Sequence, residues 1–107
     1  MFKRALTYDD VLLKPQYSSI VSRSDIDVSS DLGSGIKLKI PIISSPMDTI
    51  TEGLMAFSMA RLGGLGVVHR YNSIEEQVKE VERGTRGEFT LAARSVGAAI
   101  GVSGDFL

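Results

Sequence analysis

The chain has 107 residues, of which 43% are hydrophobic and 23% are charged, and this composition is typical of one folded globular domain. Its 12 Lys and Arg residues nearly balance its 13 Asp and Glu residues, which argues against a nucleic acid or an anionic membrane held by net charge. Because the chain has no cysteine, it has no disulfide framework, no thiolate metal site and no cysteine nucleophile.

The first 35 residues mix short apolar runs with Ser, Asp, Gly and Pro15. This composition indicates extended segments and turns. The N-terminus carries no apolar segment of the kind found in secretory signals, and no later stretch approaches the ~18 apolar residues of a membrane span. We therefore expect an extended leader over residues 1–35 in a soluble, cytoplasmic protein.

The first strand is expected at residues 36–43, which alternate and then become continuously apolar, as in a strand that enters a two-sided core. Pro41 lacks an N–H, so we expect a break or an edge there. Residues 49–52 match a capping box and predict a helix that runs to about Leu62 and ends at the glycine pair 63–64. The large apolar residues of this helix are Leu54, Met55, Phe57, Met59 and Leu62.

The same unit then repeats. Residues 65–69 are a short apolar strand, and a second capping box at residues 73–76 predicts a helix that stops near Gly84. The apolar positions of this helix are Ile74, Val78 and Val81. A polar linker follows, and residues 95–102 form a third apolar strand.

This alternation of strands and helices predicts an α/β protein with parallel strands joined by right-handed crossovers. The turn after the first strand, residues 44–48, contains no glycine. A dinucleotide-binding open sheet normally has a Gly-rich turn at that position. The sequence therefore argues against a dinucleotide-binding open sheet and leaves a barrel as the alternative.

Five segments match a known family in order and across almost the whole chain. They are LTYDDVLLKP at 6–15, IPIISSPMDTITE at 40–52, MARLGGLGVVH at 59–69, SIEEQ at 73–77 and GAAIGV at 97–102. In these segments the chain resembles the inosine monophosphate dehydrogenase and guanosine monophosphate reductase family. Residues 44–52 read as they typically do in the dehydrogenases, whereas many reductases differ there, so the dehydrogenase branch is favoured.

The resemblance implies a fold in which the chemistry lies at the C-terminal ends of the strands of a (β/α)₈ barrel, also called a TIM barrel. We expect residues 1–107 to be the N-terminal part of that single catalytic barrel, about three βα units preceded by the leader. Many family members insert a regulatory pair of CBS modules between the second helix and the third strand. The short linker here leaves no such regulatory domain. Ile42, Val67 and Ile100 are expected to point into the barrel.

By the same resemblance, Ser45 and Met47 fall in the loop where the family contacts its nucleotide. A methionine thioether can pack against a flat purine, and a serine hydroxyl can bind ribose or phosphate. Asp48 and His69 are further candidates for the barrel mouth. Asp48 could equally compensate the positive end of the first helix. For His69, a satisfied structural histidine is the favoured interpretation. No catalytic residue and no metal ligand is assigned in this chain.

The reaction implied is the oxidation of inosine monophosphate to xanthosine monophosphate by NAD through a cysteine-bound intermediate. Since the chain has no cysteine, we expect it to be inactive alone. One alternative is the NADPH-dependent reduction of guanosine monophosphate. Another is a non-catalytic structural fragment that complements a chain carrying the remaining barrel strands. The resemblance also implies a purine nucleotide ligand and a homotetramer, and it allows a monovalent cation in the complete enzyme outside this segment.

Overall fold

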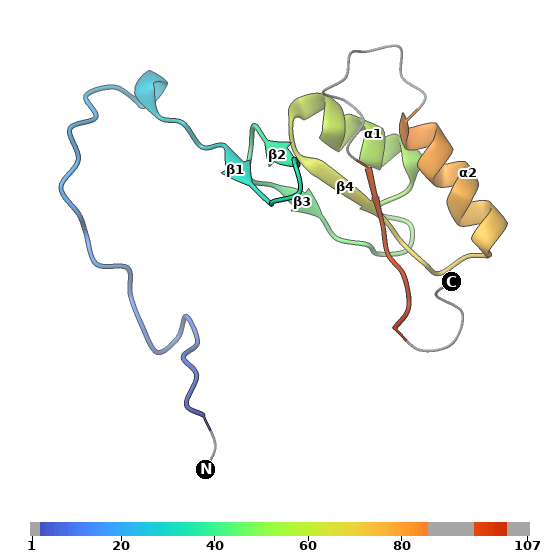
Figure 1. The fold of residues 1–107 in the computed structure, drawn as a ribbon, viewed down its shortest axis with the longest axis horizontal. Coiled ribbons are helices and arrows are strands. Elements are labelled where there is room, and N and C mark those ends of the chain that lie inside the picture. The colour runs from blue at the N-terminus through green and yellow to red at the C-terminus, as the bar shows by residue number, and fades with distance from the viewer. Residues whose placement is uncertain (1–2, 86–95, 103–107) are drawn as a thin grey trace.

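The computed structural model describes residues 3–85 and 96–102. Residues 3–29 form an extended arm whose one regular element is a short 3₁₀ helix, η1 (Arg23–Asp25). The arm runs away from the rest of the molecule (Figure 1), and its side chains are exposed. The predicted leader, residues 1–35, includes this arm, and its extent stays a prediction.

A short antiparallel hairpin follows the arm and corrects the first predicted strand. Strand β1 (Ser30–Asp31) pairs with β2 (Lys37–Leu38), and the connecting loop contains three consecutive residues with positive φ, Gly33, Ser34 and Gly35. Residues 36–43 are therefore not one strand. They divide at Pro41, as its missing N–H predicted, and only Ile43 continues into the parallel sheet.

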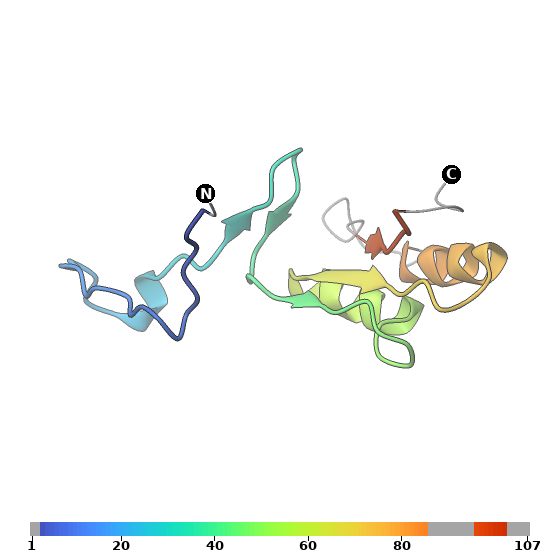
Figure 2. The ribbon, with the colours of Figure 1, turned by 90° about the horizontal axis from the view of Figure 1, so that it is seen from below.

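The parallel sheet has the strand order β3 (Ile43–Ser44), β4 (Leu65–Val68) and β5 (Val96–Ala98). The connections are α1 (Gly53–Leu62) and α2 (Ile74–Thr85). The two helices contact each other, so both lie on the same face of the sheet, as Figures 1 and 2 show. Consecutive strand order with both helices on one face differs from a doubly wound sheet, which carries helices on both faces. The predicted α/β class is confirmed.

The start of α1 differs from the sequence prediction, whereas its end agrees. The helix begins at Gly53, its N-cap Glu52 makes no side-chain capping bond, and Thr49 has a φ of 60°. The predicted capping box at residues 49–52 is therefore wrong. The first helical N–H, that of Gly53, instead donates to Glu80 Oε2 of α2 at 2.8 Å. The helix ends as predicted at Gly63, which has a φ of 90°.

Helix α1 packs through small residues rather than through its large apolar ones. Ala56 and Ala60 are buried, and a Cβ added at Gly66 of β4 would lie 2.3 Å from Ala56 Cα. This close approach requires a glycine in β4. The large apolar residues that the sequence suggested for this face lie partly outside it, since Leu54 is 77% and Leu62 is 69% exposed.

Helix α2 begins with the capping box that the sequence predicts. Ser73 N–H donates to Glu76 Oε2 at 2.9 Å, and Glu76 N–H donates to Ser73 Oγ at 3.2 Å. The apolar positions expected on its packed face are not buried, since Ile74 and Val78 are exposed, whereas Gly84 is buried against Ala56. Within the described residues, neither helix is long and apolar enough to cross a membrane.

The pairing register of β4 and β5 shows which side chains point away from the helices. Gly66 and Val96 point toward α1 and α2, so their neighbours along the strands point the other way. Val67 is one of these, as expected. Ile42 and Ile100 lie outside the strand ends, so their predicted inward orientation is not reproduced within the sheet.

Candidate functional site

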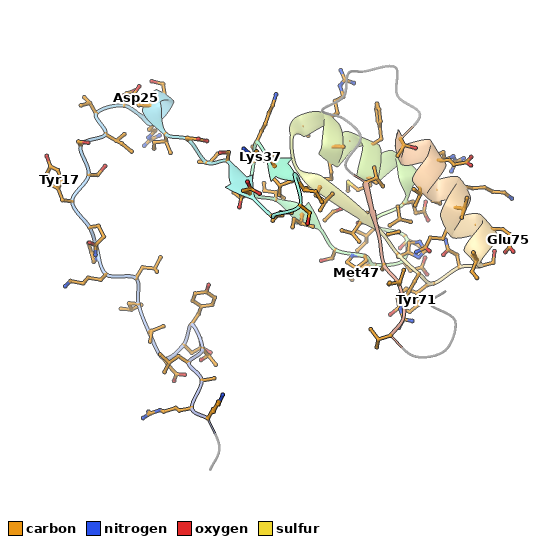
Figure 3. The ribbon with its side chains drawn as sticks, viewed as in Figure 1. Tyr17, Asp25, Lys37, Met47, Tyr71 and Glu75 are labelled. Carbon is orange, nitrogen blue, oxygen red and sulfur yellow. The ribbon has the colours of Figure 1, made fainter. Side chains whose placement is uncertain are left out.

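The predicted site residues gather at one edge of the parallel sheet, where the strands end. Ser45, Met47 and Asp48 follow β3, and His69 follows β4. Because carboxyl ends of neighbouring parallel strands meet at the same edge, the fold brings these two segments together. Figure 3 shows Met47 and Tyr71, the latter from the loop after β4, at this edge.

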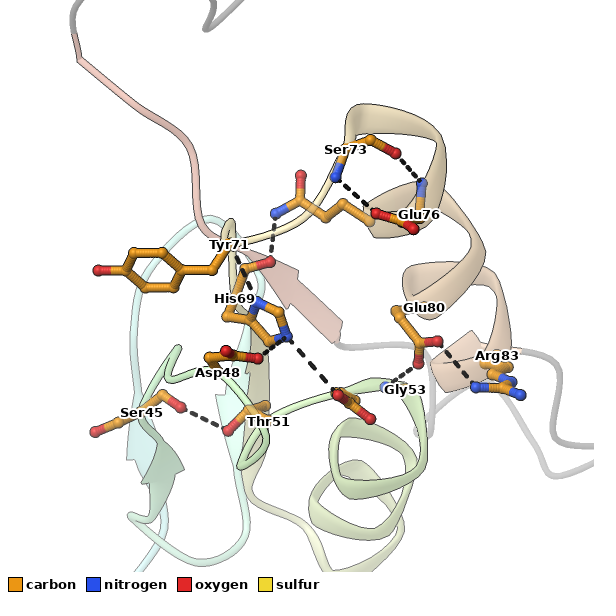
Figure 4. Close-up of polar contacts among 12 residues, drawn as sticks. Ser45, Asp48, Thr51, Gly53, His69, Tyr71, Ser73, Glu76, Glu80 and Arg83 are labelled. Carbon is orange, nitrogen blue, oxygen red and sulfur yellow. Dashed lines mark hydrogen bonds and ion pairs between the residues drawn. The ribbon is translucent and has the colours of Figure 1, made fainter.

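Thr51 organises the loop between β3 and α1. Its side chain is fully buried, and its hydroxyl donates to the Ser45 carbonyl at 2.6 Å (Figure 4). Its N–H donates to the Met47 carbonyl at 3.1 Å, while its own carbonyl accepts from His69 N at 3.3 Å. These three bonds fix the main chain of the loop and attach it to the end of β4.

The side chains of this loop remain available although its main chain is fixed. Met47 is 53% exposed, and Ser45 is exposed. The Ser45 carbonyl is already used, because it accepts from Met47 N at 2.8 Å as well as from Thr51. What the loop presents to a ligand is therefore a thioether and a hydroxyl on a well-defined backbone.

His69 is held in one tautomer by its surroundings. The residue is 3% exposed, and its Nδ1 accepts from the N–H of Tyr71 at 3.1 Å. A ring nitrogen that accepts a hydrogen bond carries no proton, so the proton of the neutral ring lies on Nε2. Nε2 faces Asp48 Oδ1 at 3.7 Å and Glu52 Oε1 at 4.0 Å (Figure 4). This geometry fits the structural interpretation of His69.

The cluster formed by Asp48, Glu52 and His69 does not fit a metal ion. Ligand atoms of these three residues lie within 4.8 Å of one another. A metal on Nε2 would need a lone pair there, which moves the ring proton to Nδ1. That proton would then meet the Tyr71 N–H, so two donors would face each other. The cluster is better described as two carboxylates beside an imidazole N–H donor.

Asp48 lies close to the start of the first helix and also faces His69. Helix α1 begins five residues after Asp48, and its first turn contains no acidic residue. A carboxylate oxygen of Asp48 nevertheless lies within 4.8 Å of a carboxylate oxygen of Glu52, the N-cap of α1, and its Oδ1 lies 3.7 Å from His69 Nε2. The compensation of the positive helix end by Asp48 therefore stays a prediction.

Three residues at this edge were not singled out from the sequence. They are Thr51, Glu52 and Gln77. Thr51 and Glu52 were interpreted as parts of a capping box, although Thr51 bonds the main chain of Ser45, Met47 and His69, and Glu52 faces the ring of His69. Gln77 Nε2 donates to the carbonyls of His69 and Ala99. The sequence did contain one indication that Gln77 faces the sheet: it is an uncharged polar residue on the same side of the helix as Val81.

Comparison with known proteins shows which family the chain matches. Residues 5–107 match a family described as IMP dehydrogenase / GMP reductase domain. The chain is 60% identical over 80 residues to the inosine-5'-monophosphate dehydrogenase of Methanocaldococcus jannaschii, covering 75% of this chain and 16% of that protein. It is 52% identical over 80 residues to the dehydrogenase of Nitrosopumilus maritimus (75% and 17%) and 50% identical over 86 residues to that of Bacillus subtilis (80% and 17%). The chain therefore spans about a sixth of the length of these relatives.

Proposed function

The chain belongs to the IMP dehydrogenase / GMP reductase family, and from this premise we propose that it is part of an oxidoreductase that converts inosine monophosphate to xanthosine monophosphate with NAD. The relatives described above are named as dehydrogenases, which supports this branch over the NADPH-dependent reductase. In this reaction NAD would be the second substrate and the hydride acceptor.

The proposed architecture is the N-terminal part of a single (β/α)₈ barrel over residues 1–107, with the extended leader at residues 1–35. Consecutive parallel strands with both helices on one face support this proposal, because a barrel is built by repeating that unit. Only ten residues, 86–95, lie between α2 and β5, which supports the absence of a CBS insertion at this point. The remaining strands would come from the same chain or from another chain.

The proposed contribution of this chain is to bind and orient the purine nucleotide. The observation that carries the proposal is the contrast within the loop after β3: Thr51 fixes the main chain, yet Met47 remains half-exposed at the edge where barrel enzymes bind substrate. A methionine that only filled a core would be buried. Met47 would pack against the purine, Ser45 would bind ribose or phosphate, and Asp48 would line the mouth beside the buried His69.

The covalent step must be carried out by residues outside this chain. No cysteine is present in the sequence, and no other residue here is proposed as the nucleophile. We accordingly propose that the chain alone is inactive. From the family resemblance, we also propose that the working enzyme is a homotetramer of completed barrels.

A chimera tests this proposal. The chain replaces the matching segment of the Methanocaldococcus jannaschii dehydrogenase, to which it is 60% identical. NADH formation from inosine monophosphate, without activity toward guanosine monophosphate and NADPH, is the expected result. A folded chimera that binds no inosine monophosphate would contradict the proposal.

A further inference from the structure

Gln77 reaches from α2 to the ends of two neighbouring strands. Its Nε2 lies 2.9 Å from the His69 carbonyl and 2.8 Å from the Ala99 carbonyl, in a partly buried position. Both partners are carbonyl oxygens and can only accept, so the amide nitrogen, not the amide oxygen, must face them. Its two hydrogens are thus divided between the two strands.

This amide continues the strand pairing beyond the point where the backbone ladder ends. The paired residues of β4 and β5 end at Val68 and Ala98, and one more bond runs from Ala99 N to the Val68 carbonyl at 2.9 Å. The next carbonyls along the two strands, those of His69 and Ala99, are the two that Gln77 binds. A helix side chain therefore sets the separation of the two strands where their loops begin.

The contacts of His69 extend this link to a third loop. The main-chain N–H of His69 donates to the Thr51 carbonyl, so the loop after β3 is attached to the residue that Gln77 binds. The loop after β4 also contains Asn72, whose Oδ1 is buried without a hydrogen-bond partner among the described residues. A buried acceptor of this kind usually has a partner in the protein or in ordered water, and its loop is the one that Gln77 anchors.

We propose that Gln77 is a positioning residue, which holds the loops after β4 and β5 in the arrangement that binds the purine nucleotide. This inference rests on the proposed function. Gln77 need not touch the nucleotide. Its effect passes through the main chain of His69 and Ala99, which it holds in place by two donated hydrogen bonds.

Two substitutions of Gln77 in the chimera distinguish the loss of its hydrogen-bond donor from a change in the shape of its side chain. Gln77→Met has a similar length and no donor, whereas Gln77→Glu keeps the shape and places an ionised, acceptor-only carboxylate against two carbonyl oxygens. Lys79→Met is the matched control, because Lys79 is exposed on the same helix and receives the same new side chain. The measurements are hydrogen exchange at residues 69–73 and 99–102, and the KM and kcat for inosine monophosphate.

Both Gln77 variants are expected to accelerate hydrogen exchange in these two loops. They should also raise the KM for inosine monophosphate roughly tenfold, because one or two neutral hydrogen bonds are lost, and leave kcat nearly unchanged. A purely structural role would instead lower the amount of active protein, and hence the apparent kcat, without changing KM. In Gln77→Glu the KM should recover partly as the pH falls, because a protonated carboxyl regains one donor. Lys79→Met should change none of these quantities.

An unchanged KM in both Gln77 variants would overturn the proposal, and so would a KM change of equal size in Lys79→Met. If the unsubstituted chimera fails to use inosine monophosphate, the proposed function fails. Hydrogen exchange then still decides whether Gln77 holds the loops: acceleration confined to residues 69–73 and 99–102 supports the loop-holding role, and its absence rejects it.

Discussion

Met47 and Thr51 divide two tasks within one loop of eight residues, positions 45–52. Thr51 is fully buried and makes three hydrogen bonds with main-chain atoms, one of them to the Met47 carbonyl, whereas Met47 is 53% exposed although its main chain is held. A fixed backbone lowers the entropy cost of binding, because the side chain that contacts the ligand needs little further ordering. The affinity that Met47 would contribute to purine binding therefore depends on its fixed position in the loop as well as on its thioether side chain.

Replacing Met47 with Ala in the chimera should weaken the binding of inosine monophosphate by about 1–3 kcal/mol through lost apolar contact. Ser45→Ala should cost less, about 0.5–1.5 kcal/mol for one neutral hydrogen bond. Titration calorimetry measures both. Met47→Leu, which keeps the apolar volume, serves as the control and should retain most of the affinity. Unchanged affinity in Met47→Ala and Ser45→Ala, with the fold intact, would show that the loop is only structural.

Local sequence patterns predicted the helix ends that depend on residues close together in the chain. The capping box at Ser73 and Glu76 and the positive φ of Gly63 are of this kind, and both are confirmed. The capping box predicted at residues 49–52 failed because tertiary contacts prevailed. Thr51 instead bonds the segments that follow β3 and β4, and the Glu80 carboxylate of α2 accepts the hydrogen bond from the N–H of Gly53.

The site could be predicted only in part for the same reason. Asp48 and His69 each follow a parallel strand, and both were named as candidates for the barrel mouth, but the contact between their side chains was not predicted. The role of Gln77 depends on the distance between α2 and the carbonyls of His69 and Ala99, which is a property of the packed structure. Likewise, the burial of Ala56 rather than Leu54 depends on how closely α1 approaches Gly66.

The N-terminal cap of α2 should make the stability of this helix depend on pH. The Ser73 N–H donates to the Glu76 carboxylate and lowers the pKa of Glu76 below its ordinary value of 4.5. A lowered pKa in the folded state means that Glu76 stabilises the helix above the ordinary pKa, and that this contribution is lost as the pH falls through the folded pKa.

Glu76→Gln should therefore be less stable than the parent chimera near neutral pH, and the difference should shrink as the pH falls from about 6 to about 3. Thermal melting at a series of pH values measures it. Glu75→Gln removes the same charge one residue earlier, without the capping bond, and should show a smaller difference. A stability difference for Glu76→Gln that stays constant over this range would contradict the assignment.

At the scale of the whole molecule, the described residues bury little apolar surface. The buried hydrophobic residues are Leu38, Ala56, Ala60 and Val68. Many large apolar side chains of the arm, among them Leu12, Leu13 and Val21, are almost fully exposed. So small a core does not offset a chain entropy of about 1–2 kcal/mol per residue. The exposed apolar surface and the open edges of the three-stranded sheet favour association with further strands.

The isolated 107-residue chain should therefore not behave as a compact, stable monomer, and it should not produce NADH from inosine monophosphate. Analytical ultracentrifugation and thermal melting at low concentration test the first expectation, and an absorbance assay tests the second. Association or a broad, non-cooperative transition is expected. A monomer with a sharp transition would mean that residues 3–29 cover the open sheet in solution, contrary to their extended position here.

We propose that the loop after β3 lies against the purine, and photolabelling can locate this contact. The chimera is irradiated with 8-azidoinosine monophosphate, digested and mapped by mass spectrometry, with an excess of inosine monophosphate as the competitor. A label is expected in the peptide that contains Ser45 and Met47, and the competitor should abolish it and Met47→Ala should reduce it. Competitor-sensitive labelling confined to peptides outside residues 43–52 would show that the loop does not contact the purine.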